Sequence, residues 1–464
     1  MLDLALFLVV IGMFLLGLRK PFIWVLAYLY IDILAPQKIG WSLAQLLPVS
    51  LIAFLLAFGG WAVAEKKDGF RLSMRQGLLA ALLVWCFITL QWADFPEAGA
   101  EKWAWVWKAL VFAIFLPLTL TTKLRIEAAM LITVLTAAAI IISAGLKTVG
   151  GGGGYGNLYL FVNDNSNIYE SSTLSTVAIA LIPIILWFMR HGTIFKPDWR
   201  VKLFGAALIF ACLLIPIGTE ARTGLLCIAA LGLMLLRDVK RRFLYIGAAA
   251  AIGIAALPFL PSTFTERMST IKEAQSEQSA STRMQVWSWT LDYVERNPLG
   301  GGFDVYRGNS FTYKMPVKEV DGNTVRVTYQ DVTESGRAFH SSWFEMLGEQ
   351  GWPGLILWTL LHVTGLVQME RIRRRYAGRT GRIEGWQGPL ASALQFANII
   401  YLVGATFQGI AYQPVVLMIV GLQIALADHV KRRESALDKA AFKEVKAANR
   451  RADARAAAPD PAIP

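Results

Sequence analysis

Charged residues are scarce in this chain of 464 residues. Lys, Arg, Asp and Glu make up only 17% of it, whereas 55% of the residues are hydrophobic. Soluble globular domains carry about 25% charged residues, so the composition excludes an ordinary soluble enzyme and indicates a polytopic membrane protein. The formal net charge of +12 comes from short basic clusters between apolar runs, without interleaved aromatic residues. That pattern is typical of cytoplasmic loops and does not indicate nucleic acid as a partner.

Cysteine is equally rare. Cys86, Cys212 and Cys227 all lie within apolar stretches, which excludes a disulfide framework and indicates small buried side chains. The side of the chain that we predict to be external has no Asp-x-Asp pair and no His, Asp and Glu at metal-ligand spacing. We therefore expect no metal and no cofactor. The N-terminus has no basic n-region and no small-residue cleavage site, so the first apolar run is expected to remain as an uncleaved span.

Long apolar runs are what the chain has in abundance. A run of about 17 to 25 residues can cross the hydrocarbon core of a bilayer as a helix, and we identify thirteen candidates, two of them short. They predict an all-α polytopic membrane protein with about 12–13 transmembrane helices. The candidate runs are 2–18, 21–36, 44–64, 76–92, 103–120, 126–146, 170–189, 202–217, 222–236, 243–260, 342–368, 388–408 and 412–429.

The basic clusters predict the orientation of these spans. If Arg19 and Lys20 are cytoplasmic, alternation of the spans places all the large basic clusters and the C-terminal tail on that same side, as the positive-inside rule requires. The short loops on the opposite side hold only Lys38, Lys102, Lys147 and Arg222. The cytoplasmic clusters are Lys66/Lys67/Arg71/Arg75, Lys123/Arg125, Arg190/Lys196/Arg200/Lys202, Arg237/Lys240/Arg241/Arg242, Arg371/Arg373/Arg374/Arg375 and Lys431/Arg432/Arg433.

Residues 261–339 form one large external loop, too polar for a membrane span. Loops of this length are usually functional or disordered. We expect N-terminal transmembrane helices over 1–200, a core over 201–430 that includes this loop, and a basic tail over 431–464, partly disordered.

Two elements are expected within the loop. Val286, Trp289 and Tyr293 recur at helical spacing between Ser281 and Arg296, which predicts an amphipathic helix. Residues 304–339 alternate polar and β-branched residues around Asp321-Gly322-Asn323, which predicts a hairpin. Two other external segments are less informative: 91–102 is acidic and aromatic, typical of an interface, and the glycine run in 150–167 indicates a flexible connector rather than a phosphate-binding loop.

Two arginines stand out as candidate functional residues. Arg222 lies between two apolar runs on the side where arginine is scarce. It could simply reach the headgroups, or it could be functional, as ionisable groups at membrane depth generally are; the sequence leaves both open. Arg283 begins the amphipathic helix, where a solvated position is equally compatible with its spacing. Arg337 at the end of the loop is a further candidate for substrate binding.

His340 lies where the chain re-enters the membrane. Glu345 and Glu349 follow it, and a histidine at this boundary beside carboxylates and a basic loop is a candidate general base. Glu349 is a candidate for substrate binding. Gly351-Trp352-Pro353-Gly354 is expected to kink or restart the helix.

These segments together resemble the O-antigen ligase and O-antigen polymerase superfamily. Residues 220–224 (Glu-Ala-Arg-Thr-Gly) resemble its Ser-Arg-Ser/Gly motif. Residues 283–287 and 297–303 are similar to its Arg-x-x-x-Trp and Asn-Pro-Leu-x-Gly-x-Gly segment, and 340–355 resembles its His-Asn signature, with Ser341 in place of the usual Asn. Residues 19–22 and 35–38 resemble the subgroup of O-glycosylation ligases associated with exosortase systems.

The resemblance implies a function and a place in the cell. It implies a GT-C-like fold in the bacterial inner membrane, with a periplasmic loop over the active site. The donor would be a glycan on undecaprenyl diphosphate, and the acceptor a lipid, a glycan or a protein. Arg222 and Arg283 would hold the diphosphate, and His340 would deprotonate or orient the acceptor hydroxyl, giving a metal-independent, inverting glycosyltransferase.

Three alternatives remain open from sequence. A polymerase would use the same site and donor with a second lipid-linked glycan as acceptor, so only the product separates it from a ligase. A transporter of lipid-linked glycans would favour charged residues along a path through the spans and repeated halves; Lys108 is one of few such residues, and we find no internal repeat. A non-catalytic scaffold would tolerate loss of Arg222 and His340.

Overall fold

The computed structural model describes residues 2–40, 47–65, 67, 72–152, 158, 160–162, 167–237, 239–256, 265, 278–321, 324–377 and 385–456. Nearly all of its elements are helices. In chain order they are α1 (Leu2–Arg19), α2 (Phe22–Leu34), α3 (Pro36–Ile39), α4 (Val49–Ala64), α5 (Met74–Thr89), η1 (Leu90–Trp92), α6 (Pro96–Thr119), α7 (Lys123–Val149), η2 (Asn167–Tyr169), α8 (Ser171–His191), α9 (Trp199–Gly218), α10 (Arg222–Leu236), α11 (Arg242–Ala256), α13 (Gln278–Arg296), η5 (Val305–Gly308), β1 (Ser310–Asp321), β2 (Thr324–Ser335), α14 (Ser342–Tyr376), α15 (Gln387–Ala405) and α16 (Pro414–Ala456).

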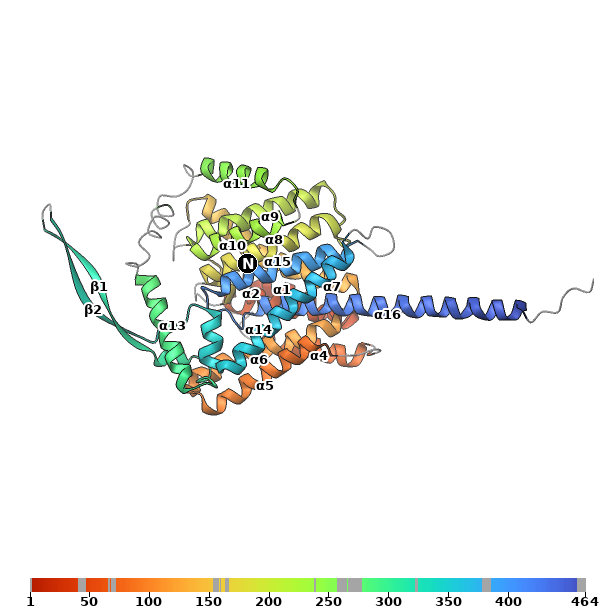
Figure 1. Ribbon diagram of the computed structural model, residues 1–464, viewed down its shortest axis with the longest axis horizontal. Coiled ribbons are helices and arrows are strands. Elements are labelled where there is room, and N and C mark those ends of the chain that lie inside the picture. Colours follow the sequence, from red (N-terminus) through yellow and green to blue (C-terminus); the bar gives the residue numbers. More distant parts are fainter. Residues whose placement is uncertain are drawn as a thin grey trace, which may run out of the picture.

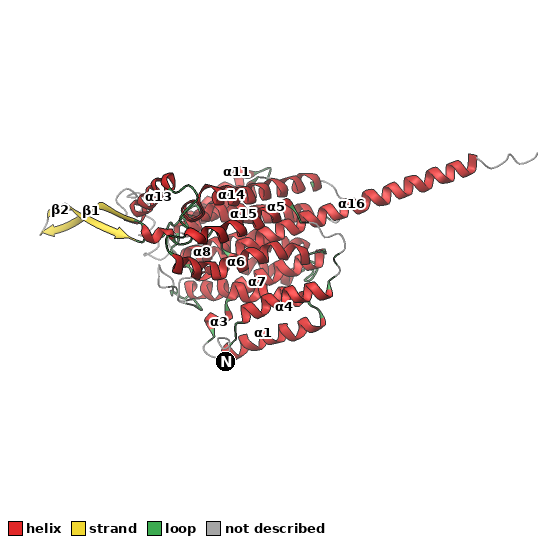
Figure 2. Ribbon diagram, turned by 90° about the horizontal axis from the view of Figure 1, so that it is seen from below, coloured by secondary structure: helices red, strands yellow, loops and turns green. Residues whose placement is uncertain are grey.

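The long helices lie side by side along the longest axis of the molecule, and the β1–β2 hairpin and the end of α16 project in opposite directions (Figures 1 and 2). We call these the hairpin end and the tail end. Among the described residues, eight helices are long and apolar enough to cross a membrane, and α2, α4 and α10 are shorter apolar helices. Each of the thirteen expected runs coincides with a helix. The all-α polytopic membrane fold is therefore confirmed.

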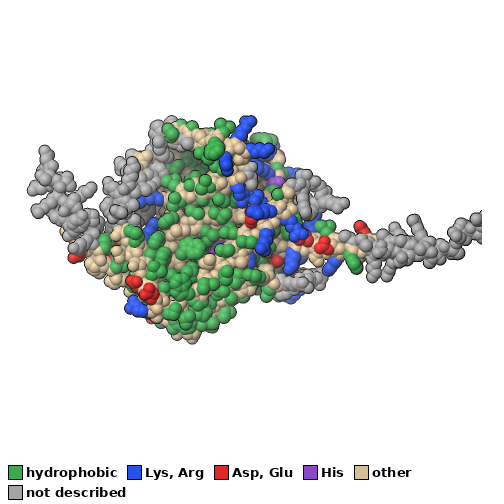
Figure 3. Space-filling model, viewed as in Figure 1, with side chains coloured by type: hydrophobic (Ala, Val, Ile, Leu, Met, Phe, Trp, Pro, Cys, Tyr) green, Lys and Arg blue, Asp and Glu red, His purple; other side chains and the backbone are tan. Residues whose placement is uncertain are grey.

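The surface is arranged as expected for a bundle in a bilayer. Hydrophobic side chains cover the middle of the visible face, and Lys and Arg gather toward the tail end (Figure 3). Only 11% of α1 is buried within the protein, and this helix lies at the edge of the bundle (Figure 2). The charge distribution is the one that the positive-inside rule describes, and assignment of the tail end to the cytoplasm stays a prediction.

The helices before and after residue 200 share one interior. One buried cluster joins Leu79 and Val106 of α5 and α6 to Phe303, Trp358 of α14 and Val420 of α16. Burial of apolar side chains stabilises by about 25 cal/mol per Å², so this shared cluster fixes α5 and α6 against the C-terminal helices. This packing crosses residue 200, and the division of the chain expected from the sequence stays a prediction.

The local elements expected within residues 261–339 are present. Helix α13 covers the predicted amphipathic helix, and β1 pairs antiparallel with β2 from Ser310↔Ser335 to Asp321↔Thr324. The turn residues 322–323 lie outside the described residues, as do most of the glycine-rich segment 150–167 and of residues 257–277. The expected kink is also present, because Gly351 inside α14 has φ 64° and ψ −167°.

Candidate functional site

Arg222 is the first residue of α10, and two packing contacts decide where it lies. Thr219, in the turn before it, shares a hydrogen bond with Ser175 of α8, at 2.8 Å between the hydroxyl oxygens. A Cβ on Gly224 would lie 2.7 Å from Pro216 and 3.0 Å from Ser175, so only glycine permits this close approach. The start of α10 therefore lies against the start of α8, with Arg222 half-buried between solvent and the bundle.

His340 lies immediately before α14, and Gln408 ties this helix start to α8. The Ser342 hydroxyl donates to the Gln408 carbonyl at 2.8 Å. The Gln408 amide donates to the Ser172 carbonyl at 3.0 Å and to the Thr176 hydroxyl at 2.9 Å. The starts of α8, α10 and α14 are thus linked at the hairpin end of the bundle.

Trp287 of α13 fixes the backbone next to His340. Its indole donates to the Phe339 carbonyl at 2.9 Å and stacks on Phe344, with ring centroids 4.9 Å apart. Arg283 precedes Trp287 by four residues, so the two side chains share one face of α13. Two of the predicted site residues, Arg283 and His340, are therefore brought to the same place.

The electrostatic surroundings of His340 favour the neutral imidazole. The neighbouring protein lowers the pKa of His340 below its usual value because it displaces water, and the charges of Arg283 and Arg337 lower it further, whereas Glu170 opposes them. Glu170 caps α8 by accepting from the Thr173 backbone N–H at 2.5 Å. A neutral imidazole near neutral pH can accept a proton from a hydroxyl.

Arg337 is already paired. Its guanidinium Nε and Nη2 each donate to Glu334 at 2.8 Å, and 51% of its side chain is exposed. The same Glu334 lies 3.4 Å from the Thr282 hydroxyl of α13. Glu334 thereby connects the base of the hairpin to α13 and holds the Arg337 guanidinium, and a contact of Arg337 with substrate stays a prediction.

Glu349 lies in the interior rather than at an open surface. Its side chain is 0% exposed, and its Oε1 accepts from Lys102 Nζ at 2.7 Å and from the Asp304 backbone N–H at 3.0 Å. Lys102 also lies 2.8 Å from Glu345 Oε1 and 3.5 Å from Asp304 Oδ1. We call these four residues the Lys102 cluster. A substrate could reach Glu349 only if this cluster opened.

Sequence reasoning missed Lys102 and Glu170 as members of this region. The available signal was the pair Glu345 and Glu349, one turn apart on an otherwise apolar helix, because two buried carboxylates require a cation nearby. Nothing in the sequence identified which cation. Among the described residues, no group of three His, Cys, Asp or Glu side chains lies close enough to hold a metal ion.

The glycine-rich segment 297–302 packs into the break in α14. The N–H groups of Gly301 and Gly302 donate to the carbonyls of Gly348 and Glu349 at 3.0 and 2.9 Å, and Trp352 N–H donates to Pro298 at 3.0 Å. A Cβ on Gly300, whose φ is 80°, would lie 2.4 Å from the Gly351 nitrogen. The segment therefore joins the end of α13 to α14 through backbone contacts that only glycine allows.

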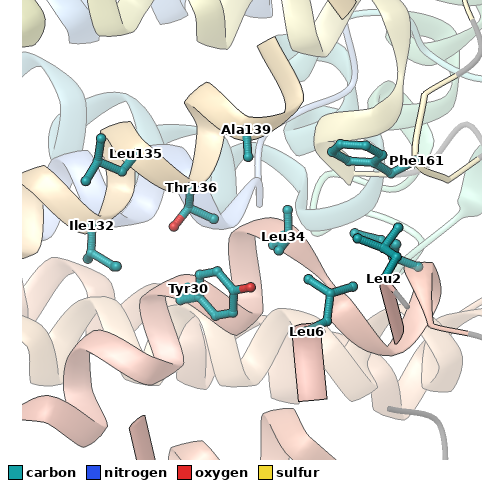
Figure 4. Close-up of a pocket in the computed structure, with 10 residues that line it drawn as sticks. Leu2, Leu6, Tyr30, Leu34, Ile132, Leu135, Thr136, Ala139 and Phe161 are labelled. Atoms are coloured by element: carbon teal, nitrogen blue, oxygen red, sulfur yellow. The ribbon is translucent and has the colours of Figure 1, made fainter. Parts of the chain in front are cut away.

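A cavity of about 260 Å³ lies between α1, α2 and α7 and contains none of the predicted site residues. Its lining is mostly apolar, and the hydroxyls of Tyr30 and Thr136 are its polar groups (Figure 4). It suits hydrocarbon rather than a charged group, so the candidate site remains at the hairpin end. The cavity is lined by Leu2, Leu6, Tyr30, Leu34, Ile39, Ile132, Leu135, Thr136, Ala139 and Phe161.

Comparison with known protein families divides the chain into two matches. Residues 206–359 match a family described as O-antigen ligase, and residues 1–193 match a family of unknown function. No curated protein matches the chain. The O-antigen ligase match contains Arg222, Arg283 and His340. Lys102 and Glu170 lie in the match to the family of unknown function. The narrower resemblance to exosortase-associated ligases stays a prediction.

Proposed function

We propose, from the match of residues 206–359 to the O-antigen ligase family, that this chain is an O-antigen ligase-like membrane enzyme. It would transfer a glycan from undecaprenyl diphosphate to an acceptor hydroxyl. The reaction would take place on the periplasmic side of the bacterial inner membrane, without a metal and with inversion at the anomeric carbon. The observation that carries the proposal is the convergence of Arg283, Glu170 and the start of α14 around His340.

The diphosphate would be held by positive groups at the hairpin end. Arg222 and Arg283 carry planar guanidinium groups that can bind phosphate oxygens with two parallel hydrogen bonds. The starts of α8, α10 and α14 lie together there, and helix N-termini attract anions. These groups would stabilise the negative charge that develops on the leaving diphosphate.

His340 would act on the acceptor. Its neutral imidazole accepts the proton of the acceptor hydroxyl while the hydroxyl oxygen forms a bond to the anomeric carbon. The bond from that carbon to the phosphate oxygen breaks on the opposite face, and the electron pair leaves with undecaprenyl diphosphate. One displacement of this kind inverts the configuration, and general-base catalysis contributes about 10²–10⁴-fold.

The test uses purified full-length protein, lipid-linked donor and EDTA, with lipid A-core, a protein or a second undecaprenyl-linked glycan supplied in separate reactions. We expect transfer in EDTA. We expect Arg222→Ala and His340→Ala each to abolish transfer under the conditions that detect the wild-type enzyme, leaving at most a residual rate about 10²–10⁴-fold lower, without loss of protein. Arg200→Ala, at an exposed position on the tail end, serves as the matched control and should retain full activity.

The product of the same assay separates the alternatives. A lengthened glycan on undecaprenyl would identify a polymerase, whereas glycan on lipid A-core or protein would identify a ligase. Activity that survives Arg222→Ala and His340→Ala, or a requirement for added metal, would contradict the mechanism. Movement of donor across liposomes without any product would instead identify a transporter.

A further inference from the structure

Lys102 is a buried cation enclosed by three carboxylates from distant parts of the chain. It lies on α6, its side chain is 13% exposed, and its Nζ is 2.8 Å from Glu345, 2.7 Å from Glu349 and 3.5 Å from Asp304. The ring faces of Phe303 and Tyr412 complete its surroundings, with centroids 5.9 and 5.1 Å away. Lys102 therefore compensates Glu345 and Glu349 where water is largely excluded, and it shares Asp304 with Arg307, whose Nη2 lies 3.5 Å from Asp304 Oδ2.

The carboxylates hold the segments that border His340. Glu345 lies in the first turn of α14, which begins directly after His340 and Ser341, and its second oxygen accepts from the Ala411 backbone N–H at 3.0 Å. Glu349 lies one turn further and accepts from the Asp304 backbone N–H. Through these contacts Lys102 joins α6 to the start of α14, to the segment before η5 and to the turn between α15 and α16.

Neighbouring residues of the same N-terminal region support the same segments. Trp85 donates to the Gln350 carbonyl at 2.7 Å, and Trp92 donates to the Gly300 carbonyl at 3.0 Å. Asp94 accepts from the Tyr293 hydroxyl at 2.6 Å. The end of α13 and the break in α14 therefore both rest on α5, on η1 and on the segment before α6. These elements lie within the match to a family of unknown function.

We propose that Lys102 is a positioning residue for the transfer reaction: the N-terminal region supplies it to hold the start of α14 and so to set the orientation of His340. This inference rests on the function proposed above. Loss of one partner from a buried ion cluster leaves uncompensated charge, and the carboxylates would then shift or take up protons. A displacement of about 1 Å near a reacting group can reduce a rate about 10²-fold.

The first experiment measures kcat and the donor KM for Lys102→Met, Lys102→Arg and Glu101→Gln. Glu101 is the exposed neighbour of Lys102 on α6, so its variant changes charge by one unit without touching the cluster. We expect Lys102→Met to lower kcat about 10- to 100-fold, with a donor KM within about threefold of the wild-type value. Lys102→Arg should recover part of kcat. Glu101→Gln should have the wild-type kcat and KM.

A double-mutant cycle distinguishes positioning from general loss of structure. Lys102→Met introduced into His340→Ala should reduce the residual rate far less than it reduces the wild-type rate, because residues that act as a unit are not additive. An equal reduction in both backgrounds, or an unchanged kcat in Lys102→Met, would overturn the inference. If Lys102→Met does not accumulate, Glu345→Gln replaces it. That change removes one of the buried negative charges and weakens the Lys102–Glu345 link between α6 and α14. The same fall in kcat is expected.

A second readout does not depend on activity. Diethyl pyrocarbonate modifies accessible neutral imidazoles, and peptide mass spectrometry reports the rate for His340 separately from the other histidines. We expect the His340 rate to change at least about threefold in Lys102→Met and not in Glu101→Gln. Inactive wild-type protein would defeat the proposed function, whereas an unchanged His340 rate would defeat this inference by itself.

Discussion

The pKa of His340 depends on desolvation and on three charged residues, of which Arg283 and Glu170 lie far from it in the chain. The loss of water around His340 lowers its pKa most, and the charges of Arg283 and Arg337 lower it further, whereas Glu170 at the start of α8 raises it. A lowered pKa means that the imidazole of His340 is mainly neutral near pH 7. If His340 is the base, activity is present above this pKa and is lost as the pH falls through it.

Replacement of Glu170 tests this arrangement. Glu170→Gln removes the charge that favours the imidazolium, so the pKa of His340 should fall further and the acid limb of the kcat/KM profile should move to lower pH. We expect a shift of less than about one pH unit, since single charges at partly solvated sites act weakly. The measurement is the pH–rate profile of the transfer reaction between pH 4 and 9.

Glu295→Gln is the control for that profile. Glu295 is an exposed carboxylate on α13, and its loss should leave the acid limb where it is. A limb that moves to higher pH in Glu170→Gln, or that moves equally in both variants, would show that Glu170 does not act on the catalytic base.

At the level of elements, α14 is two helical segments joined at Gly351. The break exposes backbone groups that a continuous helix would use internally, and the segment 297–302 pairs with them. A Cβ at Gly351 would lie 2.4 Å from the Pro298 oxygen and would occupy a backbone conformation with φ 64°. Glycine is therefore needed in both segments, because a Cβ in either one would prevent the two backbones from approaching so closely.

Gly351→Ala should therefore destabilise the protein. Strain at a positive φ costs about 1–3 kcal/mol, and the contact with Pro298 adds to it, so we expect a lower melting temperature in detergent and weaker protection of α13 from protease. Gly77→Ala is the matched control: Gly77 is an exposed helical residue, and a Cβ there would have no neighbour within 4 Å. Its replacement should stabilise α5 by up to about 1 kcal/mol. Equal melting temperatures for the two variants would contradict this account.

For the whole molecule, the bundle separates an end with a polar hairpin from an end rich in Lys and Arg (Figures 1 and 3). The candidate site lies at the hairpin end, and α16 extends from the other. A lipid-linked donor in the outer leaflet could reach Arg222 and His340 only if the hairpin end faces the periplasm. The orientation of the bundle is therefore a prerequisite of the proposed reaction.

Cysteine labelling tests the orientation directly. Leu299 at the hairpin end is 48% exposed, and Lys196 lies in an exposed loop at the tail end. A membrane-impermeant maleimide should label Leu299→Cys in spheroplasts and Lys196→Cys only after the membrane is broken. The native Cys86, Cys212 and Cys227 are each 0% exposed, so the unmodified protein serves as an unlabelled background. The reverse pattern would exclude a periplasmic site.

The sequence by itself determined where the helices lie and which local elements interrupt them. Long apolar runs must bury their backbone hydrogen bonds in helices, helical spacing fixed α13, and a Gly-Trp-Pro-Gly run could not continue α14 undisturbed. These features depend on residues near one another in the chain. Arg283 and His340 could be selected in the same way, since each sits in a recognisable local segment.

Only the tertiary structure decided which charges meet. Lys102 and Glu345 are separated by 243 positions in the sequence, and nothing local to either one specifies the other. The burial of Glu349 and the position of Glu170 beside His340 likewise depend on how α6, α8 and α14 pack. Electrostatic pairing acts through space at a few ångströms, so its partners are set by the arrangement of helices and not by spacing along the chain.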